Sequence, residues 1–129
     1  MKRILICDDN LVNRSILMDY IDDVDIENGI YIEESEKIIE MARAIEKKDF
    51  DLLFLSTSLK ELRKHSLETI LHAVRQIDPE IPIVLTASAM DEQKLANLIF
   101  MIPNVNFLKK PFDKKRTTYV TKTLLFIEK

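Results

Sequence analysis

Several polar side chains of this sequence come directly after short apolar runs. They comprise two carboxylates, two hydroxyls and one ammonium, on Asp8, Asp9, Ser56, Thr86 and Lys110. Carboxylates pair with cations, whereas a serine hydroxyl becomes a nucleophile only when a general base lies beside it. The only two histidines, His65 and His72, follow none of these apolar runs. The pattern therefore indicates a polar crevice without an activated serine.

Five short apolar runs are typical of strands, and helical patterns separate them. The strands are predicted at residues 4–7, 30–32, 51–55, 83–86 and 105–108. The run at 51–55 is apolar without interruption after its first residue, which suits a strand that is covered on both faces, as in parallel sheets. Strands that alternate with helices predict an α/β fold with a doubly wound parallel sheet. The carboxyl ends of such strands share one edge, so the five polar residues should meet there.

Helix limits follow from capping residues and apolar stripes. Asn10, Ser35, Ser66, Asp91 and Asp113 are the expected starts of five helices. The first helix should bury Val12, Ile16 and Tyr20 beside Leu17, Ile21 and Val24, and the second Ile38, Ala42 and Ile45. The last should turn Val120, Leu124 and Ile127 inward. Residues 59–65 are expected to form a charged connection, and Asn28-Gly29 a turn.

Composition restricts the class of protein. The chain of 129 residues is expected to form one domain, residues 1–129, and its 19 basic and 22 acidic residues give a net charge of -3, which argues against a nucleic-acid partner. The single cysteine, Cys7, fits a reducing compartment. No apolar run approaches the length of roughly 20 residues that a membrane span needs, so a cytoplasmic location is expected. The single glycine, Gly29, excludes both the P-loop and the dinucleotide-binding glycine motif.

In combination, four segments of the chain resemble the receiver domain of two-component response regulators, and the likeness covers essentially the whole sequence. They are Asp8-Asp9 within Asp-Asp-Asn-Leu-Val-Asn-Arg, the apolar third strand, Leu85-Thr86-Ala87, and Phe107-Leu108-Lys109-Lys110-Pro111-Phe112. The resemblance implies a flavodoxin-like (βα)5 three-layer sandwich whose five parallel strands have the order 2-1-3-4-5.

The resemblance also implies roles for individual residues. Asp8 and Asp9 would coordinate Mg²⁺, with Asp9 the direct ligand; Thr86 would contact a phosphoryl oxygen, and Lys110 would pair with the phosphoryl group. Phe107 stands where the family often has an aromatic switch residue. The Lys110-Pro111 bond stands where the family often has a cis peptide, which proline makes accessible.

The sequence departs from the family at the residue that would accept the phosphoryl group, where Ser56 replaces aspartate. Asp51 cannot substitute, because it lies at the opposite end of the strand, about 16 Å away. A carboxylate is ionised at neutral pH, whereas a serine hydroxyl must first lose its proton. Ser56 also removes a metal ligand, so Mg²⁺ should bind only weakly. The pair Asp8-Asp9 is then either a residual metal site or the counterion of Lys110.

These observations predict a pseudo-receiver that is not an enzyme and acts in phosphorelay signalling through protein contacts. The alternative is an active receiver that takes up a phosphoryl group with Mg²⁺ on another residue, such as Asp8, Asp9 or a neighbouring hydroxyl. A small-ligand binder on the same fold is a third possibility, which the shortage of glycine disfavours.

The segment 98–102 is apolar on all sides, although a helix on a sheet needs only one apolar face. Phe100 and Met101 should therefore face outward, near the last helix, which carries Tyr119 and Phe126. These side chains either pack within the domain or form a docking face. The resemblance implies that a histidine kinase, a downstream regulator or a second copy would bind this face, which comprises the fourth helix, the fifth strand and the last helix.

Overall fold

The computed structural model describes residues 1–63 and 66–126, which form five parallel strands and five α-helices in alternation. The strands are β1 Lys2–Cys7, β2 Ile30–Ser35, β3 Leu52–Ser56, β4 Ile83–Ser88 and β5 Val105–Lys110. The helices are α1 Leu11–Asp22, α2 Ile38–Lys47, α3 Leu67–Ile77, α4 Glu92–Met101 and α5 Lys114–Leu125. Two short 3-10 helices occur at Lys60–Arg63 and Ala89–Asp91. The strand order is β2-β1-β3-β4-β5, so the predicted fold class and order are confirmed.

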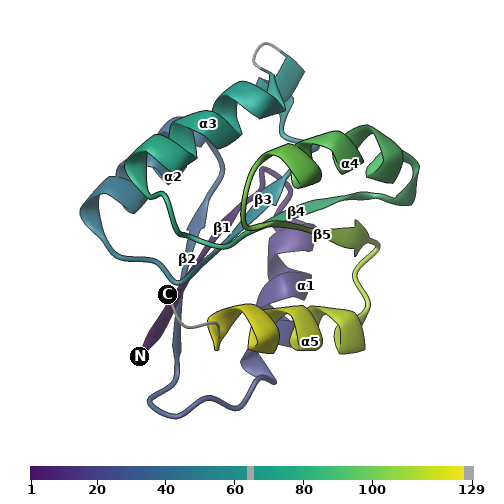
Figure 1. The fold of residues 1–129 in the computed structure, drawn as a ribbon. Coiled ribbons are helices and arrows are strands. Elements are labelled where there is room, and N and C mark those ends of the chain that lie inside the picture. The colour runs from purple at the N-terminus through teal and green to yellow at the C-terminus, as the bar shows by residue number, and fades with distance from the viewer. Residues whose placement is uncertain (64–65, 127–129) are drawn as a thin grey trace.

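The sheet has helices on both faces (Figure 1). Helices α2, α3 and α4 cover one face, and α1 and α5 cover the other. β3 is the central strand, and all five of its residues are buried because neighbours flank it on both edges and helices cover it above and below. Alternate β3 residues serve the two cores. Leu53 and Leu55 belong to the cluster under α2, α3 and α4, whereas Leu52 and Phe54 belong to the cluster under α1 and α5.

Three of the predicted helix caps are confirmed. The side chains of Asn10, Ser66 and Asp113 accept hydrogen bonds from backbone N–H groups in the first turns of α1, α3 and α5. The turn at Asn28-Gly29 is also confirmed, since both residues have positive φ angles. Asn104 likewise has a positive φ, which lets the chain turn sharply into β5.

The predicted cap at Ser35 is wrong. Ser35 pairs with Cys7 as the last residue of β2, and α2 begins only at Ile38. The carboxylate of Glu40 instead accepts from the backbone N–H groups of Glu36 and Lys37, both at 3.1 Å. Glu40, in the first turn of α2, therefore caps backbone N–H groups at the start of the helix, a role that was predicted for Ser35.

Two predicted core residues are also wrong. Val12 is exposed, because the buried face of α1 consists of Arg14, Leu17 and Ile21 and Val12 lies on the other side of the helix from Arg14. In α2 the buried residues are Met41 and the predicted Ile45, whereas Ala42 is only half-buried. Strands β2, β4 and β5 extend further than predicted, and Ile127 lies outside the described residues.

The described helices include none that is both long and apolar enough to cross a membrane.

Candidate functional site

Four strands bring their polar ends together at the carboxyl edge of the sheet, as the sequence predicts. Ser56 ends β3 and pairs in register with Thr86 of β4, and both are 1% exposed. Asp8, also 1% exposed, follows β1, and Lys110 ends β5. β4 lies between β3 and β5, so the Lys110 side chain must extend across the end of β4 to reach Ser56 and Asp8.

Lys110 is the centre of this group. Its ammonium donates to the hydroxyl oxygen of Ser56 at 2.9 Å and lies 3.5 Å from Oδ2 of Asp8. The Lys110 side chain is 14% exposed and that of Asp8 is 2% exposed, so the two charges face each other with little water between them. The Ser56 oxygen also accepts from the backbone N–H of Ser58 at 3.1 Å. Ser56 is thus a buried, doubly hydrogen-bonded hydroxyl.

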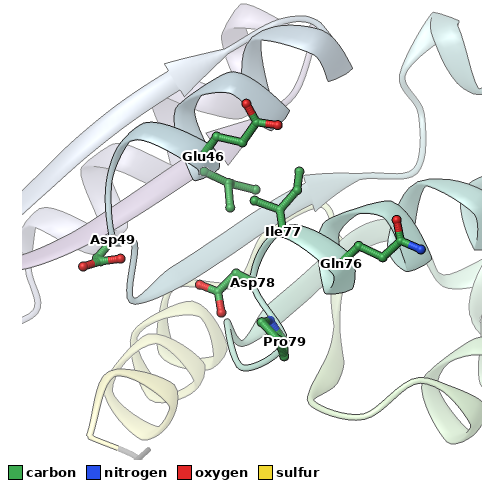
Figure 2. Close-up of a pocket in the computed structure, with 7 residues that line it drawn as sticks. Glu46, Asp49, Gln76, Ile77, Asp78 and Pro79 are labelled. Atoms are coloured by element: carbon green, nitrogen blue, oxygen red, sulfur yellow. The ribbon is translucent and has the colours of Figure 1, made fainter.

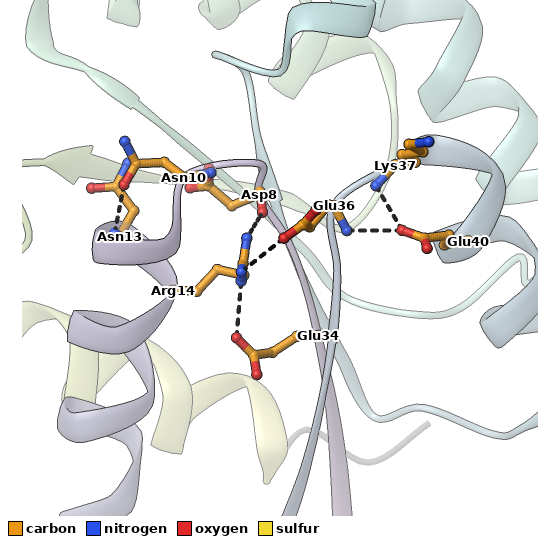
Figure 3. A network of polar contacts seen from close by, with 8 residues as sticks. All are labelled: Asp8, Asn10, Asn13, Arg14, Glu34, Glu36, Lys37 and Glu40. Atoms are coloured by element: carbon orange, nitrogen blue, oxygen red, sulfur yellow. Dashed lines mark hydrogen bonds and ion pairs between the residues drawn. The ribbon is translucent and has the colours of Figure 1, made fainter.

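Three further hydrogen bonds fix Asp8. Its Oδ1 accepts from the backbone N–H of Asn10 at 2.8 Å, and its own N–H donates to the Ser35 carbonyl at 3.0 Å. Its carbonyl accepts from Arg14 at 2.7 Å (Figure 3). Arg14 is not among the predicted site residues; its one signal in the sequence is a charged residue on the α1 stripe, one turn before Leu17 and two turns before Ile21.

Asp9 and Thr86 have different surroundings. Oδ2 of Asp9 accepts from the backbone N–H of Lys60 at 2.9 Å and so holds the segment after β3 against the segment after β1. The Thr86 carbonyl accepts from both the N–H and the hydroxyl of Thr57, at 3.0 and 3.3 Å. These bonds connect the chain segments that surround Ser56.

The residues at this edge do not form a complete magnesium site. Mg²⁺ requires several oxygen ligands, and the described residues contain no group of three His, Cys, Asp or Glu side chains that could share a metal. Oδ2 of Asp8 is buried without a hydrogen bond among these residues, and the nearby Lys110 ammonium already supplies a positive charge there. The arrangement therefore suits the lysine cation better than a divalent metal.

Two other residues considered in the sequence contribute no reactive group. Burial raises the pKa of the Cys7 thiol to about 12, so the thiol stays protonated. The His72 side chain is 62% exposed on α3 and lies near Glu68. His65 lies outside the described residues.

The outward direction predicted for the apolar residues of α4 is confirmed. Phe100 is 92% exposed and Met101 is 64% exposed. Tyr119 on α5 and Phe126 directly after it are also exposed. Phe107 is half-buried against the core beneath α4. Helices α4 and α5 and the residue after α5 therefore each present large apolar side chains to solvent.

A hollow lies at the opposite edge of the sheet (Figure 2). It has a volume of about 580 Å³ and lies between the C-terminal ends of α2 and α3, where Ile45 and Ile77 contribute apolar lining. Glu46, Asp49 and Asp78 add three carboxylates to its lining, and the neutral residues Gln76 and Pro79 complete it. It shares no residue with the Ser56 site.

Solved structures share this fold. The receiver domain of NtrX from Brucella abortus is 21% identical, with a TM-score of 0.80 over 97% of this chain and 99% of that one. A two-component response regulator from Clostridium difficile is 23% identical, with a TM-score of 0.78 over 97% and 96% of the two chains. The chemotaxis response regulator CheY4 of Vibrio cholerae is 17% identical, with a TM-score of 0.77 over 96% and 98%.

Comparison by sequence identifies no relative of this chain. No protein-family model matches the chain, and no curated protein matches it significantly. At the identities above, the structural likeness establishes the fold and leaves the chemistry to be argued from the residues of this chain. On that basis, the chain has the receiver-domain fold of two-component response regulators.

Proposed function

We propose that this protein is a receiver-like signalling module of two-component pathways that takes up no phosphoryl group at its central strand and acts through protein contacts. The fold supports the signalling class, and the strand-end chemistry supports the loss of phosphoryl transfer. The protein is not an enzyme in this proposal. A cytoplasmic location fits its single cysteine.

The contact between Lys110 and Ser56, at 2.9 Å, carries the proposal. A nucleophilic serine needs a neighbour that takes its proton. Here the neighbour donates a hydrogen bond to the hydroxyl oxygen and also faces the Asp8 carboxylate at 3.5 Å. As a cation, Lys110 cannot accept a proton. The hydroxyl is therefore held in place without being activated, and its burial keeps it away from a protein kinase.

Weak Mg²⁺ binding is part of the same proposal. With serine at position 56, Asp8 and Asp9 are the two carboxylates that remain of the family's metal site, and one oxygen of each already accepts a backbone N–H. A substitution of Ser56 by aspartate would place a third carboxylate between them and Lys110. We expect Mg²⁺ to raise the melting temperature of the Ser56→Asp variant more than that of the wild type, because a ligand stabilises the state that binds it.

The decisive experiment compares the wild type with the Ser56→Asp variant after incubation with acetyl phosphate and Mg²⁺, by intact mass. The proposal expects no added phosphoryl group on the wild type and one on the variant, whose carboxylate is already ionised. Uptake by the wild type would contradict the proposal and favour an acceptor such as Asp8, Asp9 or a neighbouring hydroxyl, to be found by peptide mapping.

The exposed apolar residues of α4 and α5 suggest where a partner would bind. We propose that the α4-β5-α5 face, with Phe100, Met101 and Tyr119, docks a histidine kinase, a downstream regulator or a second copy of this chain. Large apolar side chains that form a contiguous exposed patch are typical of interaction surfaces. Because the whole chain is acidic, with a net charge of -3, we expect a protein partner rather than a nucleic acid.

A further inference from the structure

Arg14 is a charged side chain that the fold buries. It lies in α1 with 6% exposure, and all three of its nitrogen groups are engaged (Figure 3). Nε donates to Glu34 at 2.9 Å, Nη2 donates to Glu36 at 3.1 Å, and Nη1 donates to the Asp8 carbonyl at 2.7 Å. Burial alone would lower the pKa of the guanidinium, but the hydrogen bonds and charges of Glu34 and Glu36 outweigh it and raise the pKa. Arg14 therefore remains a cation in the interior.

The bonds of Arg14 complete the fixation of Asp8. The Asp8 N–H is held by the Ser35 carbonyl at 3.0 Å, and its Oδ1 is held by the Asn10 N–H at 2.8 Å. The Asp8 carbonyl is held by Arg14. One polar atom remains, Oδ2, and it is the atom that lies 3.5 Å from the Lys110 ammonium. The orientation of the carboxylate towards Lys110 thus depends on backbone groups that are tied on both sides of the residue.

The hydrogen bonds to the Asp8 N–H and to the Asp8 carbonyl both depend on residues 34–36, at the end of β2. Ser35 holds the Asp8 N–H directly, and its neighbours Glu34 and Glu36 hold Arg14, which in turn holds the Asp8 carbonyl. The side chains of Glu34 and Glu36 are 39% and 61% exposed, so they extend from the buried arginine to the surface. A continuous set of contacts therefore runs from the surface at the end of β2 to Asp8, Lys110 and Ser56.

We propose that Arg14 is a positioning residue that orients Asp8 towards Lys110 and so couples the lysine–serine contact to the end of β2. The inference rests on the proposed function, in which the contact between Lys110 and Ser56 defines the state of the module. A purely structural arginine would affect stability alone. A positioning arginine also determines how firmly the Lys110 ammonium is held.

The test measures the NMR signal of the Lys110 ammonium. In the ¹⁵N-labelled full chain, a buried and hydrogen-bonded ammonium exchanges its protons slowly, so its NMR signal can be observed and assigned by its loss in Lys110→Arg. We expect Arg14→Met to shift this signal and to speed its proton exchange several-fold. Arg75→Met is the matched control, because Arg75 is a half-buried arginine that binds carbonyls at the opposite edge of the sheet. It should leave the Lys110 signal in place.

A second variant covers the case in which Arg14→Met does not fold. The double substitution Glu34→Gln with Glu36→Gln retains the shape of both side chains and weakens their hold on Arg14. It should move the Lys110 signal in the same direction. An unchanged Lys110 signal in the folded Arg14→Met protein or in this double variant overturns the proposal. Phosphoryl uptake by the wild type would overturn the proposed function instead, and mass spectrometry detects it independently of the Lys110 signal.

Discussion

The ammonium nitrogen of Lys110, at the end of β5, lies 2.9 Å from the hydroxyl oxygen of Ser56, at the end of β3. The strand between them, β4, contributes no charged group to this contact, so Lys110 connects two strands that are not neighbours in the sheet. The same ammonium faces Asp8 after β1. One side chain thus joins three of the five strand ends.

Lys110→Met should destabilise the fold by about 3 kcal/mol, because it leaves the Asp8 carboxylate buried without its counterion. The double variant with Asp8→Asn should be more stable than Lys110→Met alone, since the unpaired charge is then absent. Denaturant unfolding of the wild type, both single variants and the double variant measures this coupling. Strictly additive effects would show that the two charges do not interact.

Arg75 should be a strong structural contributor at the other edge of the sheet. Its guanidinium donates to the carbonyls of Ile81, Pro103 and Asn104 at 2.7, 2.8 and 3.1 Å. It thereby connects the end of α3 to the segments that enter β4 and β5, while partial burial lowers its pKa. Arg75→Met should lower the free energy of unfolding by about 2 kcal/mol, because it leaves these carbonyls without their charged donor.

Arg43→Met is the matched control for that prediction. Arg43 is exposed on α2. Its loss should therefore change the free energy of unfolding by no more than about 0.5 kcal/mol, as is usual for surface substitutions. Urea unfolding of both variants under one set of conditions provides the comparison. Equal effects would mean that the carbonyl contacts of Arg75 do not stabilise the native state.

Cys7 predicts a loss of stability at high pH. Burial raises the pKa of its thiol from 9.0 to about 12, so between these values the unfolded chain loses the thiol proton while the folded chain keeps it. The contribution of the protonated thiol is complete below pH 9 and declines as the pH rises towards 12. Unfolding measured across this range should therefore show a steeper decline for the wild type than for Cys7→Ala.

The Cys7 thiol should also be unreactive in the native state. At mildly alkaline pH a thiol-specific disulfide reagent should react with Cys7 only as fast as the protein unfolds, because the side chain is fully buried. Rapid reaction under native conditions would contradict the burial of Cys7. Addition of urea should restore the ordinary reactivity of the thiol.

Phe100→Ser should separate binding from stability. Phe100 is almost fully exposed. Its loss should change the free energy of unfolding by no more than about 0.5 kcal/mol, because a side chain in solvent contributes little to the folded state. If a second copy uses this face, the substitution should weaken self-association, as measured by sedimentation over a range of concentrations.

Ile39→Ser is the control for the Phe100 prediction. Ile39 is an exposed apolar residue on α2, so its substitution should leave self-association unchanged. A wild type that stays monomeric at all concentrations would exclude self-association as the use of the α4-β5-α5 face.

The sequence determined the strand order, through its likeness to a known family, and the residues that end each strand. Uninterrupted apolar runs such as residues 52–55 are typical of strands with both faces covered, so the pattern alone indicated the buried parallel sheet. The caps at Asn10, Ser66 and Asp113 were predictable because a cap acts on amides close to it in the sequence. The prediction of a cap at Ser35 was wrong because Ser35 pairs with Cys7 and so continues β2. Such pairing depends on a segment that is distant in the sequence.

The contacts that the polar residues make depend on the three-dimensional packing of the chain. The sequence placed Asp8, Ser56 and Lys110 at one edge, but which of these groups form hydrogen bonds with one another depends on side-chain directions that residue types do not specify. The burial of Arg14 could not be predicted from the sequence either, because arginine is rarely buried unless partners satisfy its charge. Those partners, Glu34 and Glu36, are distant in the sequence and meet Arg14 only when β2 pairs with β1.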